Sequence, residues 1–236
     1  RLDRERAIRA GIPCMTGAQM TQTLNMDLAR SVVVETAALP WSGSRADGVV
    51  RKPLERERAE SGRATSIVQF EPGARFPPHT HRLGEEILVL DGVFSDETGD
   101  YPAGTYLRNP PGSRHAPHSD PGCTLFVKLE QFDPEDREQV VVNTHSAPFQ
   151  PGIGGLRVLH LHSFGSEHTA LVHWPAGEHF QPHRHWGGEE ILVLSGEFID
   201  EHGRYPAGTW IRSPHHSQHN PWVERETLIY VKTGHL

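Results

Sequence analysis

The sequence is poor in cysteine, in positive charge and in long apolar segments. Its 236 residues contain only two cysteines, Cys14 and Cys123, too few for a disulfide framework, so a reducing cytoplasm is the expected location. The net charge of −7 at pH 7 argues against nucleic acid or an anionic membrane surface as a partner. No apolar run approaches the roughly 18 residues of a membrane-spanning helix. Segment 1–10 is charged and lacks the apolar core of a signal peptide.

Turn-forming residues are abundant instead. The chain has 23 glycines and 19 prolines, and no sustained helical periodicity occurs between residues 31 and 236. Such a composition favours many short strands, and the length leaves room for two domains of about 100 residues each. We therefore expect an all-β protein with little helix. Its predicted divisions are an N-terminal tail or arm at 1–30, one unit at 31–140 and a second unit at 141–236.

One pattern of histidine and glutamate occurs twice. Aligning segment 76–110 with segment 180–214 gives 23 identities in 35 positions without a gap, where chance would give on the order of two. Every residue of the pattern recurs 104 positions later. The two sets are His79, His81, Glu85 and His115, and His183, His185, Glu189 and His219. Three imidazoles and one carboxylate form a complete set of ligands for a divalent transition metal.

The spacing predicts that each set converges on one point. His79 and His81 are two residues apart, so on a strand their side chains point to the same face. The segment 82–84 then turns the chain, which lets Glu85 point back toward them at the start of the next strand. We expect Asp91-Gly92 to end that strand in a hairpin, and His115 to return on a later strand.

Other polar residues near the repeat have alternative roles. Glu86 and Glu190 follow the predicted ligands and should point to the opposite strand face, where Arg108 and Arg212 are their expected partners. His215 and His216 belong either to the lining of a pocket or to a solvated loop. The remaining histidines, His162 and His235 among them, are expected on strand surfaces or loops.

These motifs resemble those of the cupin superfamily. The first cupin motif, G-x5-H-x-H-x3-E-x6-G, is matched from Gly73 to Gly92 and again from Gly177 to Gly196. The second motif, G-x5-P-x-G-x2-H-x3-N, is matched in part in each unit. In the second unit His216 replaces the glycine, and both units lack the final Asn. The shared wording Gly-Glu-Glu-Ile-Leu-Val-Leu and Tyr-Pro-Ala-Gly-Thr is similar to that of the ChrR-type cupins, the family named after an anti-sigma factor.

The resemblance, which covers about residues 31–236, implies two tandem cupin barrels of the double-stranded β-helix or jelly-roll type. It also implies up to two divalent metals per chain, zinc or iron first, with manganese or nickel as alternatives. Sigma-factor binding does not transfer, because the chain lacks the Cys-x2-Cys pair of the anti-sigma domain. A small-molecule ligand or substrate is the expected partner, and a homodimer is a possible assembly.

Two functions are compatible with such a protein. The first is a metal-binding module with a sensory or ligand-binding role, in which four ligands close the coordination of zinc. The second is an Fe(II)-dependent dioxygenase that cleaves a small diketone-like or catechol-like substrate, because an octahedral metal would keep two positions open. In the second case Glu85 and Glu189 are the candidate catalytic bases.

Overall fold

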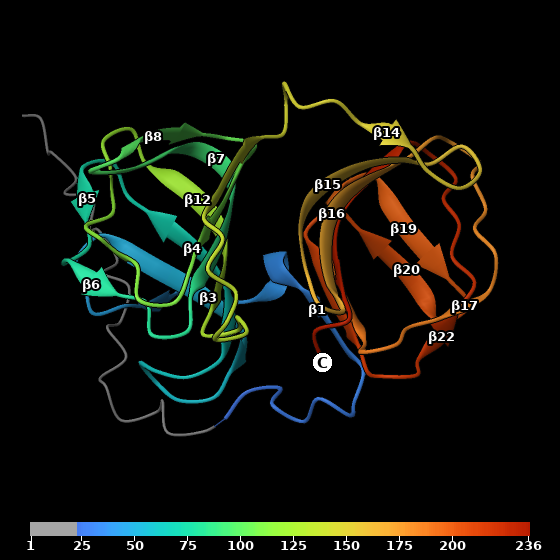
Figure 1. Cartoon of the computed structure of the whole chain (residues 1–236), viewed down its shortest axis with the longest axis horizontal. Helices are drawn as coiled ribbons and strands as arrows, with labels where there is room; N and C mark the ends of the chain where they lie inside the picture. Colours follow the sequence, from blue (N-terminus) through green and yellow to red (C-terminus); the bar gives the residue numbers. More distant parts are fainter. Residues whose placement is uncertain (1–22) are drawn as a thin grey trace, which may run out of the picture.

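The computed structural model describes residues 23–236, and these fold into two β-barrels that lie side by side (Figure 1). The prediction of an all-β chain with two cupin barrels is confirmed. The one helical element between residues 23 and 236 is the 3-10 turn η1, Thr36–Ala38. No helix in this part of the chain has the length and apolarity needed to cross a membrane.

Barrel 1 is built on a large antiparallel sheet in the order β13-β9-β7-β12-β4-β3-β2. Its strands are β2 (Ser42–Gly43), β3 (Val49–Arg56), β4 (Ala64–Phe70), β5 (Ala74–Arg75), β6 (His79–Thr80), β7 (Glu85–Asp96), β8 (Gly99–Pro102), β9 (Thr105–Asn109), β10 (Arg114–His115), β11 (His118–Ser119), β12 (Cys123–Leu129) and β13 (Val140–Asn143). The pairs β6–β10, β7–β8 and β5–β11 form the opposite wall.

Barrel 2 repeats this plan, with a sheet in the order β1-β21-β18-β23-β16-β15-β14. Its strands are β1 (Val32–Glu35), β14 (Gln150–Pro151), β15 (Arg157–Phe164), β16 (Glu167–Trp174), β17 (His183–Arg184), β18 (Glu189–Ser195), β19 (Glu197–Asp200), β20 (Gly203–Pro206), β21 (Thr209–Ser213), β22 (Gln218–His219) and β23 (Thr227–Thr233). The pairs β17–β22 and β19–β20 complete it.

The strand pairing crosses the unit boundary expected at residue 140. β1, which the sequence places at the start of the first unit, pairs with β21 of barrel 2, while β13 pairs with β9 of barrel 1. Each barrel therefore contains one edge strand from the other predicted unit. Of the expected N-terminal arm, residues 1–22 lie outside the described part of the chain. Leu24 forms backbone hydrogen bonds with Arg56 of barrel 1, and the Asn25 and Asp27 carbonyl oxygens accept hydrogen bonds from Arg212 of barrel 2.

The expected hairpin at Asp91-Gly92 is wrong. β7 continues through both residues as far as Asp96, and its pairing with β12 shifts register between Thr124 and Leu125. Gly92 has a φ of 73°, and a Cβ there would lie 2.0 Å from the Gly122 carbonyl oxygen. The register shift leaves Leu90 as the extra residue of β7, so a bulge next to Asp91-Gly92 bends the strand, rather than a turn that ends it.

Three apolar clusters hold the fold together. One fills the interior of barrel 1 around Phe94, and another fills the interior of barrel 2 around Trp174. The third joins the barrels, because it contains Phe126 of barrel 1 and Tyr230 of barrel 2, whose rings meet edge to face with centroids 5.2 Å apart. The two barrels thus share a buried interface.

Candidate metal centres

In barrel 1 the four predicted ligands come together at one end of the interior. β6 and β10 pair so that His79 lies opposite His115, and His81 follows β6 directly. His81 Nε2 lies 3.0 Å from His115 Nε2, and Glu85 Oε2 lies 3.3 Å from each of these nitrogens. One ligand atom from each residue lies within 4.8 Å of all the others. This is the size of a site for one cation.

The hydrogen bonds behind the rings leave lone pairs facing the centre. His79 Nδ1 lies 2.9 Å from the Pro77 carbonyl oxygen and can only donate to it, so its Nε2 is free of a proton in the neutral ring. His115 Nδ1 lies 3.2 Å from Asp96 Oδ2 in the same way. Ring nitrogens and a carboxylate that converge with their lone pairs repel one another unless a cation lies between them. The donor set fits a divalent transition metal.

Barrel 2 has the same arrangement. His183 Nδ1 lies 3.0 Å from the Gln181 carbonyl oxygen, and its Nε2 lies 3.2 Å from His219 Nε2. Glu189 Oε2 lies 3.4 Å from His185 Nε2 and 3.6 Å from His219 Nε2. His185 Nε2 and Glu189 Oε2 are buried without a hydrogen-bond partner. Two orphaned acceptors in a buried site need a ligand, and a metal ion satisfies both.

The protonation behaviour of these groups agrees with such a site. Burial lowers the pKa of His79 and His81 and lowers that of His185 to about 3. These rings are therefore neutral at physiological pH, the form in which histidine binds metals. Burial also opposes a charge on His115, but its hydrogen bond to Asp96 and the negative charges of Glu85 and Asp96 together outweigh this and raise the pKa of the ring.

Asp96 and Asp200 support the centres and were missed in the sequence. Asp200 Oδ2 lies 3.3 Å from His219 Nδ1, as Asp96 does from His115. Burial raises the pKa of Asp96, but hydrogen bonds from His115 and Thr98 outweigh this and lower it to about 2. A carboxylate behind a metal-binding histidine fixes its tautomer and orientation. The signal was available, because both aspartates recur in the repeat at the same spacing of 104.

The two glutamate ligands have different surroundings. In barrel 1 the Asn109 amide donates to Glu85 Oε2 at 3.1 Å, whereas the residue 104 positions later is Ser213. Burial raises the pKa of Glu85, but the neighbouring histidines and Asn109 outweigh it, so the net shift is downward. Burial raises the pKa of Glu189 to about 7. The centres are alike in their ligands but not in what stabilises the carboxylate.

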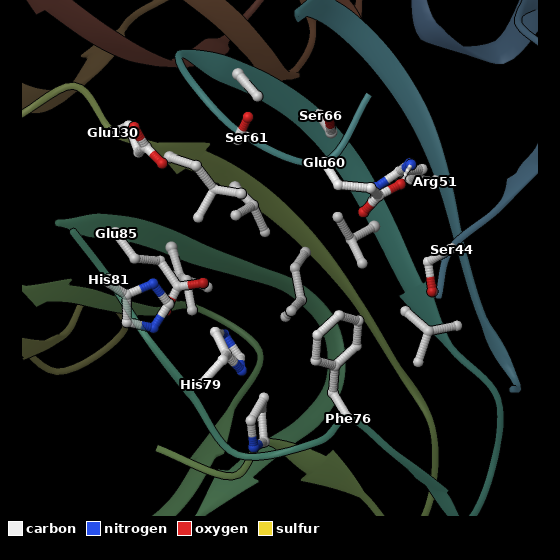
Figure 2. A pocket seen from close by; sticks show the side chains of 18 of the residues that line it. Ser44, Arg51, Glu60, Ser61, Ser66, Phe76, His79, His81, Glu85 and Glu130 are labelled. Atoms are coloured by element: carbon white, nitrogen blue, oxygen red, sulfur yellow. Dashed lines mark hydrogen bonds and ion pairs between the residues drawn. The ribbon is translucent and has the colours of Figure 1, made fainter. Parts of the chain in front are cut away.

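Each centre opens into a cavity. The barrel 1 cavity has a volume of about 190 Å³, and His79, His81 and Glu85 lie at one end of it while Arg51 and Glu60 lie at the other (Figure 2). The barrel 2 cavity is larger, about 680 Å³, and reaches His183, His185, Glu189 and His219. A small molecule in either cavity could contact a metal held there.

His215 and His216 lie outside this lining. Both are exposed, the His215 ring accepts a hydrogen bond from the Gly187 backbone N–H at 2.7 Å, and Trp186 packs edge-on against His216. His216 has a φ of 67°, close to the 86° of Gly112 at the equivalent turn in barrel 1. Of the two alternatives, the solvated loop is the one observed.

Glu86 and Glu190 point away from the centres, into the interface between the barrels. Glu86 lies 3.4 Å from Arg108, as expected, but it also accepts hydrogen bonds from Lys232 at 2.7 Å and from the Tyr230 hydroxyl. These partners outweigh the effect of burial, which raises the pKa of Glu86, and lower it to about 2. The buried charge of Glu86 in barrel 1 is thus stabilised by two residues of barrel 2, Tyr230 and Lys232.

The expected partner of Glu190 is wrong. It pairs with Lys128 of barrel 1, and the Trp210 indole N–H donates to it at 2.7 Å, while Arg212 pairs with Glu55. Lys128 and Lys232 are 104 residues apart. Each lysine therefore crosses to the glutamate of the other barrel, a reciprocal exchange that pattern analysis of one unit at a time could not find.

Two further histidines are buried rather than exposed. His162 Nε2 lies 2.8 Å from Asp136, and His235 Nε2 lies 3.2 Å from Glu190. Burial lowers the pKa of His235 to about 4, so its contact with Glu190 at neutral pH is a hydrogen bond from a neutral ring rather than an ion pair.

Known proteins resemble the chain over most of its length. The family described as "ChrR Cupin-like domain" matches residues 29–133 and 137–236. No curated protein matches the sequence. A solved structure of a proposed dioxygenase from Nostoc punctiforme superposes with a TM-score of 0.74 and 15% identity, covering 88% of this chain and 84% of the other.

Two other similar structures were solved with a bound metal or small molecule. Bacterial pirin from Escherichia coli in complex with nickel(II) superposes with a TM-score of 0.67 and 11% identity, covering 86% of this chain and 98% of the other. Oxalate decarboxylase from Lactobacillus farciminis in a formate complex gives 0.63 and 14% identity, covering 86% of each chain. At such identities the likeness concerns the fold alone.

Proposed function

Since this chain belongs to the ChrR cupin-like family, we propose that it binds one divalent transition metal in each barrel and presents that metal to a small molecule. The ligands are the three histidines and one glutamate of each repeat, with zinc or iron as the first candidates. The observation that carries the proposal is the convergence of unprotonated ring nitrogens on a buried carboxylate beside an accessible cavity.

The chain's own residues hold and orient the site. Asp96 and Asp200 keep the Nδ1 proton of His115 and His219, and backbone carbonyls do the same for His79 and His183. Three of the four ligands in each barrel are buried, which limits the contact of bulk water with them. A metal bound there would supply a Lewis acid next to the cavity. Binding of a small ligand, with a sensory role, is the first function we propose.

A second candidate function is Fe(II)-dependent oxygenation of a small substrate. The specific observation in its favour is the apolar wall next to the ligands, where Phe76, Val127 and Leu125 line the barrel 1 cavity. Such a wall can hold the body of a catechol-like or diketone-like molecule against the metal position. Glu85 and Glu189, which line the two cavities, are the candidate proton acceptors. One of the structural relatives is a proposed dioxygenase, which agrees with this candidate.

Metal analysis combined with oxygen consumption separates the two functions. The protein is purified without oxygen, its metal content is measured, and O₂ uptake is followed with a panel of 1,3-diketones and catechols, before and after reconstitution with Fe(II). Substrate-dependent O₂ uptake that is lost in His81→Ala would establish the oxygenase. Stoichiometric zinc with no uptake after iron reconstitution would refute it and leave the binding role. Failure to bind any divalent metal would refute both.

A further inference from the structure

The two cavities differ most at the end away from the metal ligands. In barrel 1, Arg51 lies opposite Val68 of β4. In barrel 2, Val158 lies opposite Val172 of β16, which is the repeat equivalent of Val68. Arg51 and Val158 are therefore at equivalent positions. Both positions line their cavities, so a guanidinium in barrel 1 stands where barrel 2 has a valine. The same alignment places Arg56 at the position of Ser163, which is not among the residues lining the second cavity.

Arginines outnumber carboxylates among the described residues that line this end of the barrel 1 cavity. Arg51 pairs with Glu60, and Arg56 donates from Nε to the Ala59 carbonyl oxygen at 2.8 Å. Burial, followed by the nearby charge of Arg51, lowers the pKa of Arg56 to about 10. Burial opposes ionisation of Glu60, but Arg51, Arg56 and Arg45 outweigh it and lower the pKa of that carboxyl group. Three cations thus act on one carboxylate, an arrangement that attracts a second anion.

The Glu60 carboxylate, which pairs with Arg51, belongs to a loop that is much longer in barrel 1 than in barrel 2. Seven residues, 57–63, connect β3 to β4, whereas two residues, 165–166, connect β15 to β16. Glu60, Ser61 and Gly62 of this loop line the cavity, and the Glu60 side chain is 45% exposed. Arg51, in contrast, is 8% exposed and fixed on a strand. Glu60 can therefore move out into water while Arg51 stays in place.

We propose that the barrel 1 cavity binds a small organic acid, with its carboxylate on Arg51 in place of Glu60 and its oxygen-bearing opposite end at the metal. The body of the ligand lies along the apolar wall, where Val68, Ile87 and Leu125 line the cavity. Arginine suits this role because its guanidinium pairs with a carboxylate through two parallel hydrogen bonds. In the barrel 2 cavity Val158 takes the place of this arginine. The inference rests on the proposed metal site.

The test compares an acid with its neutral analogue. The probes are 3,4-dihydroxybenzoate, which has a metal-binding catechol and a distal carboxylate, and 3,4-dihydroxybenzamide, which lacks the negative charge. Zinc is used because it is redox-inactive and can expand from four to five ligands when a probe oxygen binds. Zinc stoichiometry of the full chain is measured before calorimetric titration with each probe. The variants are Arg51→Met, Glu60→Gln and, as the matched control at the equivalent barrel 2 position, Val158→Met.

The wild-type protein should bind the acid at least tenfold more tightly than the amide, because a charge-assisted hydrogen bond to a buried arginine is worth about one factor of ten or more. Arg51→Met should remove this preference and leave amide affinity within twofold of wild type. Glu60→Gln should tighten acid binding, since the acid no longer displaces a carboxylate. Val158→Met should leave the acid-to-amide ratio unchanged.

Zinc bound in full with equal affinities for acid and amide would overturn this inference while leaving the metal site intact. An absence of bound zinc would overturn the proposed function, and the inference with it. If Arg51→Met does not fold, Glu60→Gln still decides: unchanged or weaker acid binding in that variant overturns the displacement of Glu60.

Discussion

The reciprocal lysine–glutamate exchange makes a quantitative prediction about stability. Lys232 is fully buried, with Nζ 2.7 Å from Glu86 Oε2 and 2.8 Å from Glu167 Oε1. Lys232→Met would leave two carboxylates that share Arg108 as their remaining cation. Breaking a buried pair in this way costs about 3–5 kcal/mol, because the remaining charge stays desolvated and uncompensated.

Urea unfolding followed by tryptophan fluorescence measures this cost. Adding Glu86→Leu to Lys232→Met removes the stranded charge, so the double variant should be more stable than Lys232→Met alone. Arg204→Met, which removes an exposed ion pair with Glu224, is the control and should leave the midpoint nearly unchanged. A cost below about 1 kcal/mol for Lys232→Met, or strictly additive effects in the double variant, would refute the account of the interface.

Three further predictions concern single positions. Asp96→Asn should weaken metal binding in barrel 1 by about 10- to 100-fold in a chelator competition assay, because His115 loses the carboxylate that orients it; an unchanged affinity would contradict this. The pKa of His235 is lowered from 6.5 to about 4 in the folded protein, so the unfolded chain binds this proton more readily. Its contribution to stability is therefore full above about pH 6.5 and is lost as the pH falls toward 4. His235→Gln should flatten the pH profile of urea midpoints in that window, and an equally steep profile would be evidence against the assignment. Gly92→Ala should lower the melting temperature more than Gly73→Ala, since both have positive φ but only at Gly92 would the new Cβ meet a carbonyl oxygen, at 2.0 Å; equal losses would show that the close approach does not matter.

The sequence predicted the parts of the fold that depend on local pattern. Alternation placed His79 and His81 on one face, and the repeat placed the second set by a constant offset. Asp91-Gly92 was misread because the same dipeptide serves a hairpin turn and a bulge, and only the partner strand decides between them. Here β12 passes alongside both residues, so the strand continues.

Contacts between the barrels were beyond the sequence pattern. Glu190 faces Lys128, which is 62 residues away, and β1 joins the sheet of the barrel that follows it in the chain by more than 100 residues. Glu86 pairs with Arg108, which lies opposite it on the adjacent strand β9. Glu190 and Arg212 lie opposite each other in the same way, but Arg212 pairs with Glu55 instead, so position on adjacent strands does not by itself decide the pairing. Asn109 escaped notice since its role depends on a difference between the copies rather than on what they share.

The central claim, two separate metal centres in one chain, is tested most directly by metal stoichiometry. Mass spectrometric metal analysis of the wild type, His81→Ala, His185→Ala and the double variant, after loading with one divalent metal and removal of excess, gives the number bound per chain. Two separate centres predict 2, 1, 1 and 0 equivalents, following the two sets of four ligands. Loss of both metals from either single variant, or two metals retained in the double variant, would contradict the account.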